Sequence, residues 1–293
     1  MAAENASDLI ALVERDYTLT ERSSLRTLRF RAKHLRRLLP ADRLPTAADL
    51  DEYMATRSAE GAALATIAKE LGAIKRGYRI ATRLELVDHA PWIDVPKPHN
   101  VREVTPTREE ISAILRVLDY LDPPVADGVR WAVLTGWRRT QVFRLRWDDF
   151  SDDLDSVTVP QKRTKGRRVH RIPLSLGLQG IALGRLLVAR GPHVFHRGGR
   201  AVLHFAGAWR RAVDSAGRSE LWFHDLRRFF AATATDAGVP IPAQCQIAGW
   251  RTDSIHRRYC LLPPDTLRRG VERLTDHLVG QPPGSAKGNP HKI

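Results

Sequence analysis

The sequence predicts a mainly α-helical protein with a small β-hairpin, divided into an N-terminal helical bundle and a C-terminal α+β domain. Three observations support this fold class. Apolar residues recur three or four positions apart over most of the chain. A proline-rich stretch at 89–107 interrupts the helical pattern. Two short β-prone segments, 156–160 and 167–173, flank a basic stretch in the second half.

Residues 1–88 have the pattern of a small helical bundle. The expected helices cover 9–19, 23–39, 46–58 and 62–82. Ser23, Ser24 and Thr46 are candidate N-caps, and Pro40 and Pro45 separate consecutive helices. The second of these helices is strongly basic and contains no acid, so we expect no acid to neutralise its charge. Such a face is either solvated or directed at phosphates, and we weigh the two readings equally. On the second reading, the residues that contact nucleic acid are Arg29, Lys33 and Arg36.

The second half has its own helical pattern after a linker at 89–106. Thr107 and Glu110 form a capping-box pattern at the start of one helix, and a further helix is expected over 125–135. More helices are expected from about residue 174 onward. The second domain therefore spans 107–280, and the Gly- and Pro-rich residues 281–293 are expected to form a flexible tail.

Bulk composition limits the class of function. The net charge of +14 and the pI of about 10.5 favour a polyanionic partner, either nucleic acid or an anionic membrane. No apolar run reaches the roughly 18 to 20 residues that span a bilayer, and acids occupy the positions where a signal peptide is basic. Two cysteines and the absence of zinc-type spacing indicate a cytoplasmic protein with no bound metal.

The segment 134–150 presents a candidate functional arginine. Gly136 is expected to form a turn that places Arg138 at the start of a short helix, anchored by Val142 and Phe143. Taken alone, this segment is better explained by a surface arginine on an amphipathic helix.

The expected hairpin is rich in positive charge and contains no acid. Its basic residues are Lys162, Arg163, Lys165, Arg167, Arg168 and Arg171. We expect Lys162, Arg163, Arg167 and Arg168 to contact DNA, although a solvated basic loop is the simpler alternative. The local sequence does not distinguish Lys162 from Lys165 as a catalytic residue.

Two further motifs lie near the end of the second domain. His224 and Arg227 are three residues apart on an expected helix and therefore share a face, which would be costly to bury without an anion. The alternative for His224 is a satisfied core histidine. Trp250 follows an expected turn at Gly249, and Tyr259 lies nine residues later among basic neighbours. A tyrosine is more often a packed aromatic residue than a nucleophile, because its pKa of about 10 leaves it neutral unless cations assist.

Together, T-G-W-R-R, the hairpin lysine, H-D-L-R-R, A-G-W and Tyr259 resemble the tyrosine recombinase (phage integrase) family in type, order and spacing. The resemblance covers the whole second half and implies an integrase-type catalytic domain. The resemblance favours Lys165 over Lys162 as the hairpin lysine, because Lys165 lies eight positions before the proline of R-I-P-L. The implied catalytic residues are Arg138, Lys165, His224, Arg227, Trp250 and, as the nucleophile, Tyr259.

The resemblance implies a site-specific DNA recombinase that needs no cofactor. Tyr259 would form a 3′-phosphotyrosyl link while the arginines bind the phosphate and Lys165 protonates the leaving 5′-oxygen. Two positions depart from the family pattern. Gln141 stands where glutamate is usual, which places the positioning of Arg138 in doubt, and Trp250 stands where histidine is commoner.

The implied partners are double-stranded DNA, other protomers in a tetramer on DNA, and accessory DNA-bending proteins. The implied location is the nucleoid in the cytoplasm, and no membrane partner is expected. The helical first half resembles the core-binding domain that clamps DNA in this family. The segment 264–279 either docks on a neighbouring protomer or packs on its own domain. The sequence does not specify the target site or the biological role, although integration or excision of a mobile element is favoured.

Three other functions would account for part of the sequence. A non-catalytic DNA-binding regulator would use residues 135–145 as a helix-turn-helix, but it leaves the matched spacings unexplained. A type IB topoisomerase shares similar chemistry, yet a compact chain with a proline-rich linker fits recombination better. Binding to a membrane surface is the weakest alternative, because it does not require the catalytic set.

Overall fold

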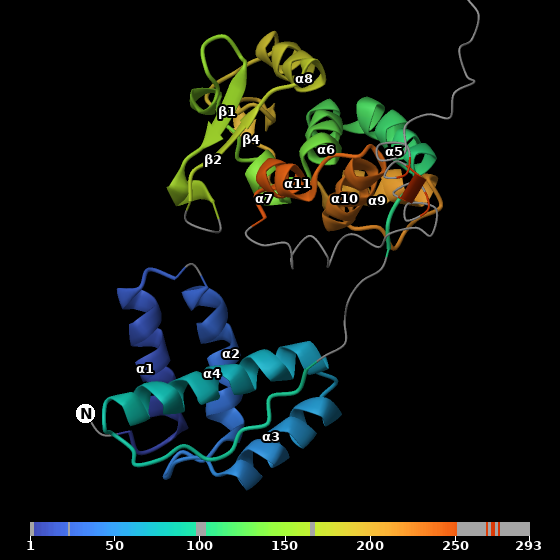
Figure 1. Ribbon diagram of the computed structural model, residues 1–293. Helices are drawn as coiled ribbons and strands as arrows, with labels where there is room; N and C mark the ends of the chain where they lie inside the picture. The colour runs from blue at the N-terminus through green and yellow to red at the C-terminus, as the bar shows by residue number, and fades with distance from the viewer. Residues whose placement is uncertain are drawn as a thin grey trace, which may run out of the picture. The chain divides into compact units, whose positions relative to one another are not determined.

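The computed structural model describes residues 3–22, 24–97, 104–164 and 168–250, together with positions 268, 271, 272 and 275. The chain divides into two compact units, Met1–Arg102 and Glu103–Ile293. In the described residues both units are mainly helical, and the strands belong to the second (Figure 1). This confirms the predicted fold class.

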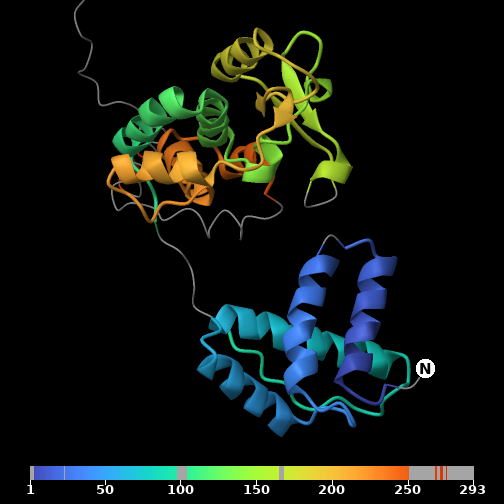
Figure 2. The same ribbon diagram turned by 180° about the vertical axis from the view of Figure 1, so that it is seen from behind.

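The first unit is a bundle of helices. Its helices are α1 (Ala6–Leu19), α2 (Leu25–Leu38), α3 (Ala47–Ala59) and α4 (Leu64–Arg83). Asn5 and Thr46 cap α1 and α3 through capping boxes, whereas Ser24 precedes α2 without a side-chain cap. The long helix α4 crosses α1 and α2, which lie side by side (Figures 1 and 2).

Apolar side chains from these helices form one core, in which Leu9, Leu35 and Ile74 are fully buried. A buried polar network joins α3 to α4. Arg57 donates to Glu70 at 3.1 Å, and the Tyr53 hydroxyl donates to the same carboxylate at 2.9 Å. Because each buried polar group finds a partner, the network fixes how the two helices pack.

The second unit contains the remaining elements. Its helices are α5 (Arg108–Leu121), α6 (Pro123–Thr135), α7 (Arg139–Val142), α8 (Leu176–Leu186), α9 (Ala206–Ser215), α10 (Leu226–Asp236) and α11 (Ile241–Ala248). Its strands are β1 (Ser156–Val159), β2 (His170–Pro173), β3 (His196–Arg197) and β4 (Arg200–Ala201). Helix α6 packs against α5 and α10, and α5 also packs against α9. The core between them is strongly aromatic and includes Trp131, Phe143 and Phe195.

Strands β1 and β2 pair antiparallel, with Val157 opposite Ile172 and Val159 opposite His170. The predicted hairpin is therefore present, although β2 begins at His170, and the short 3-10 helix η2 (Gln161–Arg163) follows β1. The pair β3–β4 was not predicted. Gly198 and Gly199 make its turn with positive φ angles. Strands of two residues each are too short to produce a recognisable alternation in the sequence.

Candidate active site

Arg138 is held at the start of α7 by the rigid segment that precedes it. Helix α6 ends at Gly136, which has a φ of 63°. A Cβ atom at this position would lie 2.6 Å from the Phe230 ring, so the close packing also requires glycine. Trp137 is fully buried, and its indole N–H donates to the carbonyl of Ile247 at 2.8 Å. Arg138 is half-buried and makes no ion pair with any described carboxylate.

Arg227 contacts the C-terminal ends of two helices, α6 and α11. Its side chain is 1% exposed and donates to the carbonyl of Gly136, at the end of α6. The same nitrogen lies 3.4 Å from the carbonyl of Ala248, at the end of α11. Its guanidinium also lies over the Trp250 ring, 5.4 Å from the centroid. Arg227 therefore contacts both segments that carry the predicted residues Arg138 and Trp250.

Trp250 follows the C-terminal cap of α11. Gly249 has a φ of 63°, which turns the chain so that Trp250 packs on Phe230 with ring centroids 5.9 Å apart. Phe230, Cys245, Ala248 and Trp250 belong to a small second core between α10 and α11. The position of Trp250 is thus fixed by packing on α10, the helix that carries Arg227.

His224 does not share a regular α-helix with Arg227, so that part of the sequence interpretation is wrong. It lies in the 3-10 turn η3 (Phe223–Asp225), and Arg227 lies in the first turn of α10. His224 is exposed, whereas both neighbours in the turn are buried. Partial desolvation lowers its pKa, and the charges of Arg227, Arg138 and Arg228 lower it further, against an opposing effect of Asp225.

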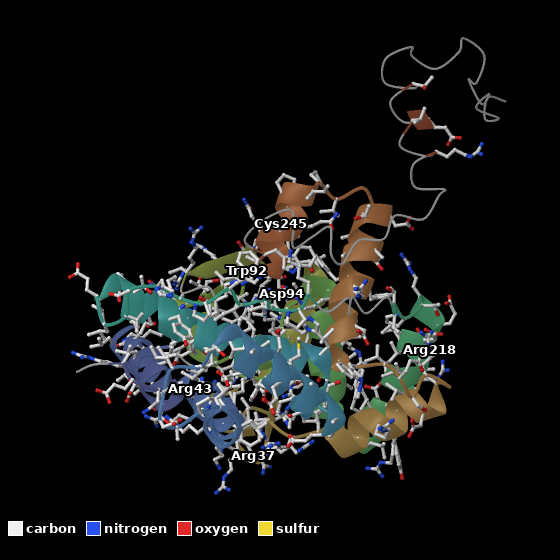
Figure 3. The ribbon with its side chains drawn as sticks, turned by 90° about the horizontal axis from the view of Figure 1, so that it is seen from below. Arg37, Arg43, Trp92, Asp94, Arg218 and Cys245 are labelled. Atoms are coloured by element: carbon white, nitrogen blue, oxygen red, sulfur yellow. The ribbon has the colours of Figure 1, made fainter. Side chains whose placement is uncertain are left out.

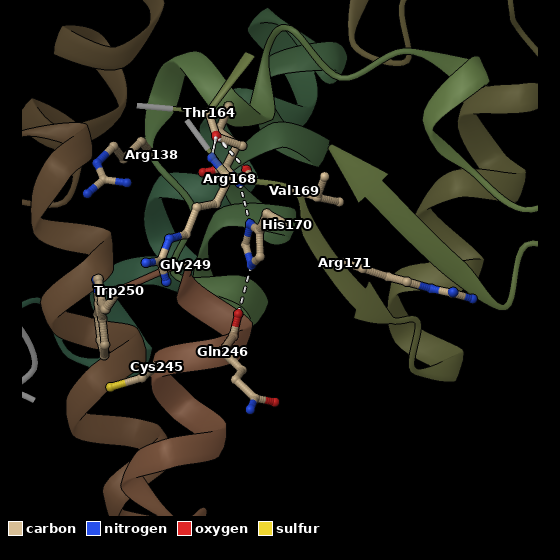
Figure 4. Close-up of a pocket in the computed structure, with 11 residues that line it drawn as sticks. Arg138, Thr164, Arg168, Val169, His170, Arg171, Cys245, Gln246, Gly249 and Trp250 are labelled. Atoms are coloured by element: carbon tan, nitrogen blue, oxygen red, sulfur yellow. Dashed lines mark hydrogen bonds between the residues drawn. The ribbon is translucent and has the colours of Figure 1, made fainter. Parts of the chain in front are cut away.

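Of these predicted residues, Arg138 and Trp250 line a pocket of about 320 Å³, whereas Arg227 and His224 are not among the residues that line it. Its lining includes Arg138, Arg168, His170, Gln246 and Trp250 (Figure 4). The Arg168 side chain extends toward Trp250. Arg171 also lines the pocket, but its side chain extends in another direction and donates to the Ser156 hydroxyl at 3.2 Å. Because its charged lining is cationic, the pocket is suited to an anionic group.

His170 is a site residue that the sequence reasoning did not select. Its Nδ1 atom lies 2.7 Å from the amide nitrogen of Gln141, and its Nε2 atom lies 2.7 Å from the carbonyl of Gln246. A lone histidine in a β-prone segment gives no local signal of this role. The departure at Gln141 was visible in the sequence, but its partner was not.

The predicted DNA-contacting residues of the hairpin occupy different environments. Lys162 and Arg168 are exposed. Arg163 forms a bidentate ion pair with the buried carboxylate of Asp149, with one contact at 2.8 Å, so an acid does neutralise part of the hairpin charge. The Thr164 hydroxyl donates to the carbonyl of Arg168 at 2.6 Å and accepts from its N–H at 3.0 Å, which closes the base of the loop. Lys165 and Arg167 lie outside the described residues.

The expectation that no acid neutralises α2 is wrong. Glu14 on α1 pairs with Arg29 at 3.5 Å and with Arg36 at 3.1 Å. Arg37, at the surface of the first unit (Figure 3), pairs with Glu60 at 2.5 Å. The acids come from other helices, so they were invisible in the sequence of α2 itself. Lys33 is exposed and has no described ionic partner.

Tyr259 and the predicted tail lie outside the described residues. No group of His, Cys, Asp and Glu side chains in the described part of the chain is arranged to hold a metal ion. Among the described helices, none combines the length and apolar character needed to cross a membrane.

Comparison with known proteins identifies the family. Residues 106–263, which include every predicted catalytic position, match the phage integrase family. The chain belongs to this family. It is 29% identical over 239 residues to the integrase of Salmonella phage P22, and 24% identical over 218 residues to the prophage integrase IntF of Escherichia coli (strain K12). The matches cover 75% and 67% of this chain but only 59% and 46% of those relatives, so the chain spans about half their length.

Solved structures of integrases share the fold. A lambda integrase dimer bound to a COC′ core site matches with a TM-score of 0.69 and 17% identity, over 88% of this chain and 77% of that one. The Tn1549 transposon integrase in complex with a circular intermediate DNA matches with a TM-score of 0.70 and 16% identity. The match covers 93% of this chain and 100% of that one.

Proposed function

We propose that this protein is a site-specific DNA recombinase that cleaves and rejoins strands through a 3′-phosphotyrosyl intermediate, with Tyr259 as the nucleophile. The substrate is double-stranded DNA at specific recombination sites, and the process is integration or excision of a mobile element. The junction at Arg227 carries the proposal, because this buried arginine contacts the two helix ends that lead to Arg138 and Trp250. Membership of the phage integrase family supports the same reading.

The proposed chemistry uses Arg138 and Trp250, which line the pocket, together with Arg227, His224 and Tyr259. Attack of the Tyr259 phenolate on phosphorus forms the phosphotyrosyl bond and breaks the bond to the 5′-oxygen of the downstream strand. Negative charge then accumulates on the non-bridging oxygens, where Arg138 and Arg227 can donate in-plane hydrogen bonds. His224 and Trp250 hydrogen-bond the same phosphate, and His224 also accepts the phenol proton. The low pKa of His224 suits this role, because a neutral imidazole is available at neutral pH.

Lys165 protonates the leaving 5′-oxygen, and a 5′-hydroxyl from a partner strand reverses the step. Because the phosphotyrosyl bond retains the energy of the phosphodiester, rejoining requires no cofactor. Four protomers act together on two duplexes, and accessory DNA-bending proteins assist. The first unit contacts the same DNA as the catalytic unit, with Lys33, Arg29 and Arg36 directed at phosphates.

The test is covalent capture. The purified protein is incubated with nicked, labelled DNA that carries its genomic flanking sites, and adducts are resolved on a denaturing gel. We expect an adduct from the wild type and none from Tyr259→Phe. The control is Tyr120→Phe, because Tyr120 is 89% exposed on α5 and should be dispensable. A wild type that binds these sites without forming an adduct would contradict the proposal and favour a non-catalytic regulator.

A further inference from the structure

His170 is held between the hairpin and α11 by two hydrogen bonds at opposite sides of its ring. It is the first residue of β2, and the closed base of the Lys165 loop lies directly before it. Its Nε2 atom bonds to the carbonyl of Gln246 on α11 (Figure 4). Its Nδ1 atom bonds to the side-chain amide of Gln141 on α7. The ring also packs on Trp137, with centroids 5.1 Å apart.

These partners define the protonation state of the ring. A carbonyl oxygen can only accept, so the Nε2 atom of His170 carries the proton that it donates to Gln246. In a neutral imidazole the Nδ1 atom is then an acceptor, and the amide N–H of Gln141 donates to it. An amide is suited to this tautomer. A carboxylate at position 141 could only accept, so both hydrogen bonds could be kept only with a second proton on the ring.

The surrounding charges favour the same neutral state. Burial lowers the pKa of His170, and the charges of Arg227 on α10 and Arg138 at the start of α7 lower it further, whereas bonding to Gln246 and Ile247 opposes this. Arg168 of the hairpin and Cys245 of α11 line the same pocket. A protonated His170 would add a cation to a group of arginines.

The packing leaves little freedom at this junction. A Cβ atom at position 249 would lie 3.0 Å from the His170 ring, so glycine is needed for the close approach of the histidine as well as for the turn. The same glycine leads directly to Trp250. The His170 ring therefore connects the strand that follows the lysine loop to the helix end that positions Trp250.

We propose that His170 is a positioning residue for DNA cleavage, which acts by fixing the lysine hairpin against α11, and that Gln141 maintains its Nε2–H tautomer. The inference rests on the proposed function, because it assigns Lys165 to the leaving oxygen. Loss of the His170 ring removes both hydrogen bonds that join the start of β2 to α7 and α11, and the expected consequence is slower protonation of the leaving 5′-oxygen.

The first experiment does not depend on cleavage. Nitrogen-15 NMR of labelled histidines in the full chain reports the tautomer and the pKa of His170, assigned with a His170→Gln variant. We expect the Nε2–H form in the wild type and a raised pKa in Gln141→Glu, since the carboxylate favours a doubly protonated ring. Gln141→Leu is the matched control that removes the hydrogen bond without adding charge. An Nδ1–H tautomer, or a pKa unchanged by Gln141→Glu, would overturn the role of Gln141.

The second experiment isolates the leaving-group step. Single-turnover adduct formation is measured on normal DNA and on DNA with a 5′-bridging sulfur, whose thiolate leaves without general-acid help because thiols are far more acidic than alcohols. We expect His170→Ala to cleave normal DNA about 100-fold more slowly and the sulfur substrate at close to the wild-type rate. Lys165→Ala should show the same pattern of rates as His170→Ala. Arg138→Ala should form the adduct slowly on both substrates. His204 is exposed, so His204→Ala should form the adduct at the wild-type rate on both.

The outcomes separate the two proposals. Rescue of Lys165→Ala but not of His170→Ala by sulfur would show that His170 does not act through the lysine, and the inference would fail while the proposed function stands. A wild type that forms no adduct on either substrate would remove the proposed function and the positioning role together, independently of the NMR result.

Discussion

Arg227 shows how a single residue organises this site. An arginine that is 1% exposed is costly unless its donors find acceptors, and here backbone carbonyls of Gly136 and Ala248 provide them. These carbonyls belong to the last turns before the segments of Arg138 and Trp250. The side chain is therefore both a structural connection and a candidate phosphate ligand.

Arg227→Lys should lower the rate of adduct formation by about 100-fold or more, because one ammonium group cannot reproduce the planar set of donors. The rate is measured in single turnover on nicked DNA, with thermal unfolding as the check that the variant is folded. A folded variant with a rate within about threefold of the wild type would contradict the role assigned to Arg227.

The free energy of unfolding should rise with pH between about 5.5 and 7. Burial lowers the pKa of His170 and of His196, and desolvation lowers that of His224. In this range the unfolded chain binds more protons than the native chain, so acidification favours unfolding. Urea titrations across the range measure the slope, which His196→Gln should reduce. A flat or inverted profile would refute the prediction.

At the scale of elements, close contacts decide which helices can pack. Gly77 lies in the middle of α4, where glycine is unfavourable by about 1 kcal/mol relative to alanine. A Cβ atom there would lie 2.8 Å from the backbone oxygen of Leu9 on α1. The glycine therefore permits the close packing of α1 on α4, and backbone atoms cannot move aside as a flexible side chain could.

Gly77→Ala should destabilise the protein by about 1–3 kcal/mol in spite of the gain in helix propensity. Gly72→Ala is the matched control on the same helix, because a Cβ atom there meets nothing within 4 Å and should stabilise by up to about 1 kcal/mol. Urea unfolding of both variants measures the difference. Equal changes in the free energy of unfolding for the two variants would show that the close α1–α4 contact does not require glycine at position 77.

Glu14→Gln should strengthen DNA binding and steepen its salt dependence, because it removes the carboxylate that competes with phosphates for Arg29 and Arg36 on α2. Fluorescence anisotropy over a range of salt concentrations measures both quantities. The control is Glu52→Gln on α3, which removes the same charge from an exposed position. Equal effects of the two substitutions would indicate general electrostatics rather than phosphate contacts by α2.

At the scale of the whole molecule, the two units have separate cores. One core contains Leu9, Leu35 and Tyr78, and the other contains Trp131, Phe143 and Phe195. If both units contact the same DNA, as proposed above, binding of one unit raises the effective concentration of the other at the DNA, and the affinity of the whole chain increases.

Residues 1–102, expressed alone, should therefore unfold cooperatively in urea, since their core is complete without the second unit. The full chain should bind DNA about 100- to 10,000-fold more tightly than either separate unit. Circular dichroism and anisotropy measure the two properties. A fragment without an unfolding transition, or with the affinity of the full chain, would argue against two cooperating units.

The sequence by itself determined the helical periodicity, the hairpin, the turns at Gly136 and Gly249, and the spacing that indicates the family. Each of these features depends on residues that are close together in the sequence, so the sequence of that segment is enough to predict it. Tertiary structure decided the rest. The pairing of Glu14 with α2, of Asp149 with Arg163 and of Gln141 with His170 joins residues on different elements. Their proximity arises only when helices and strands pack, so no local pattern could reveal it.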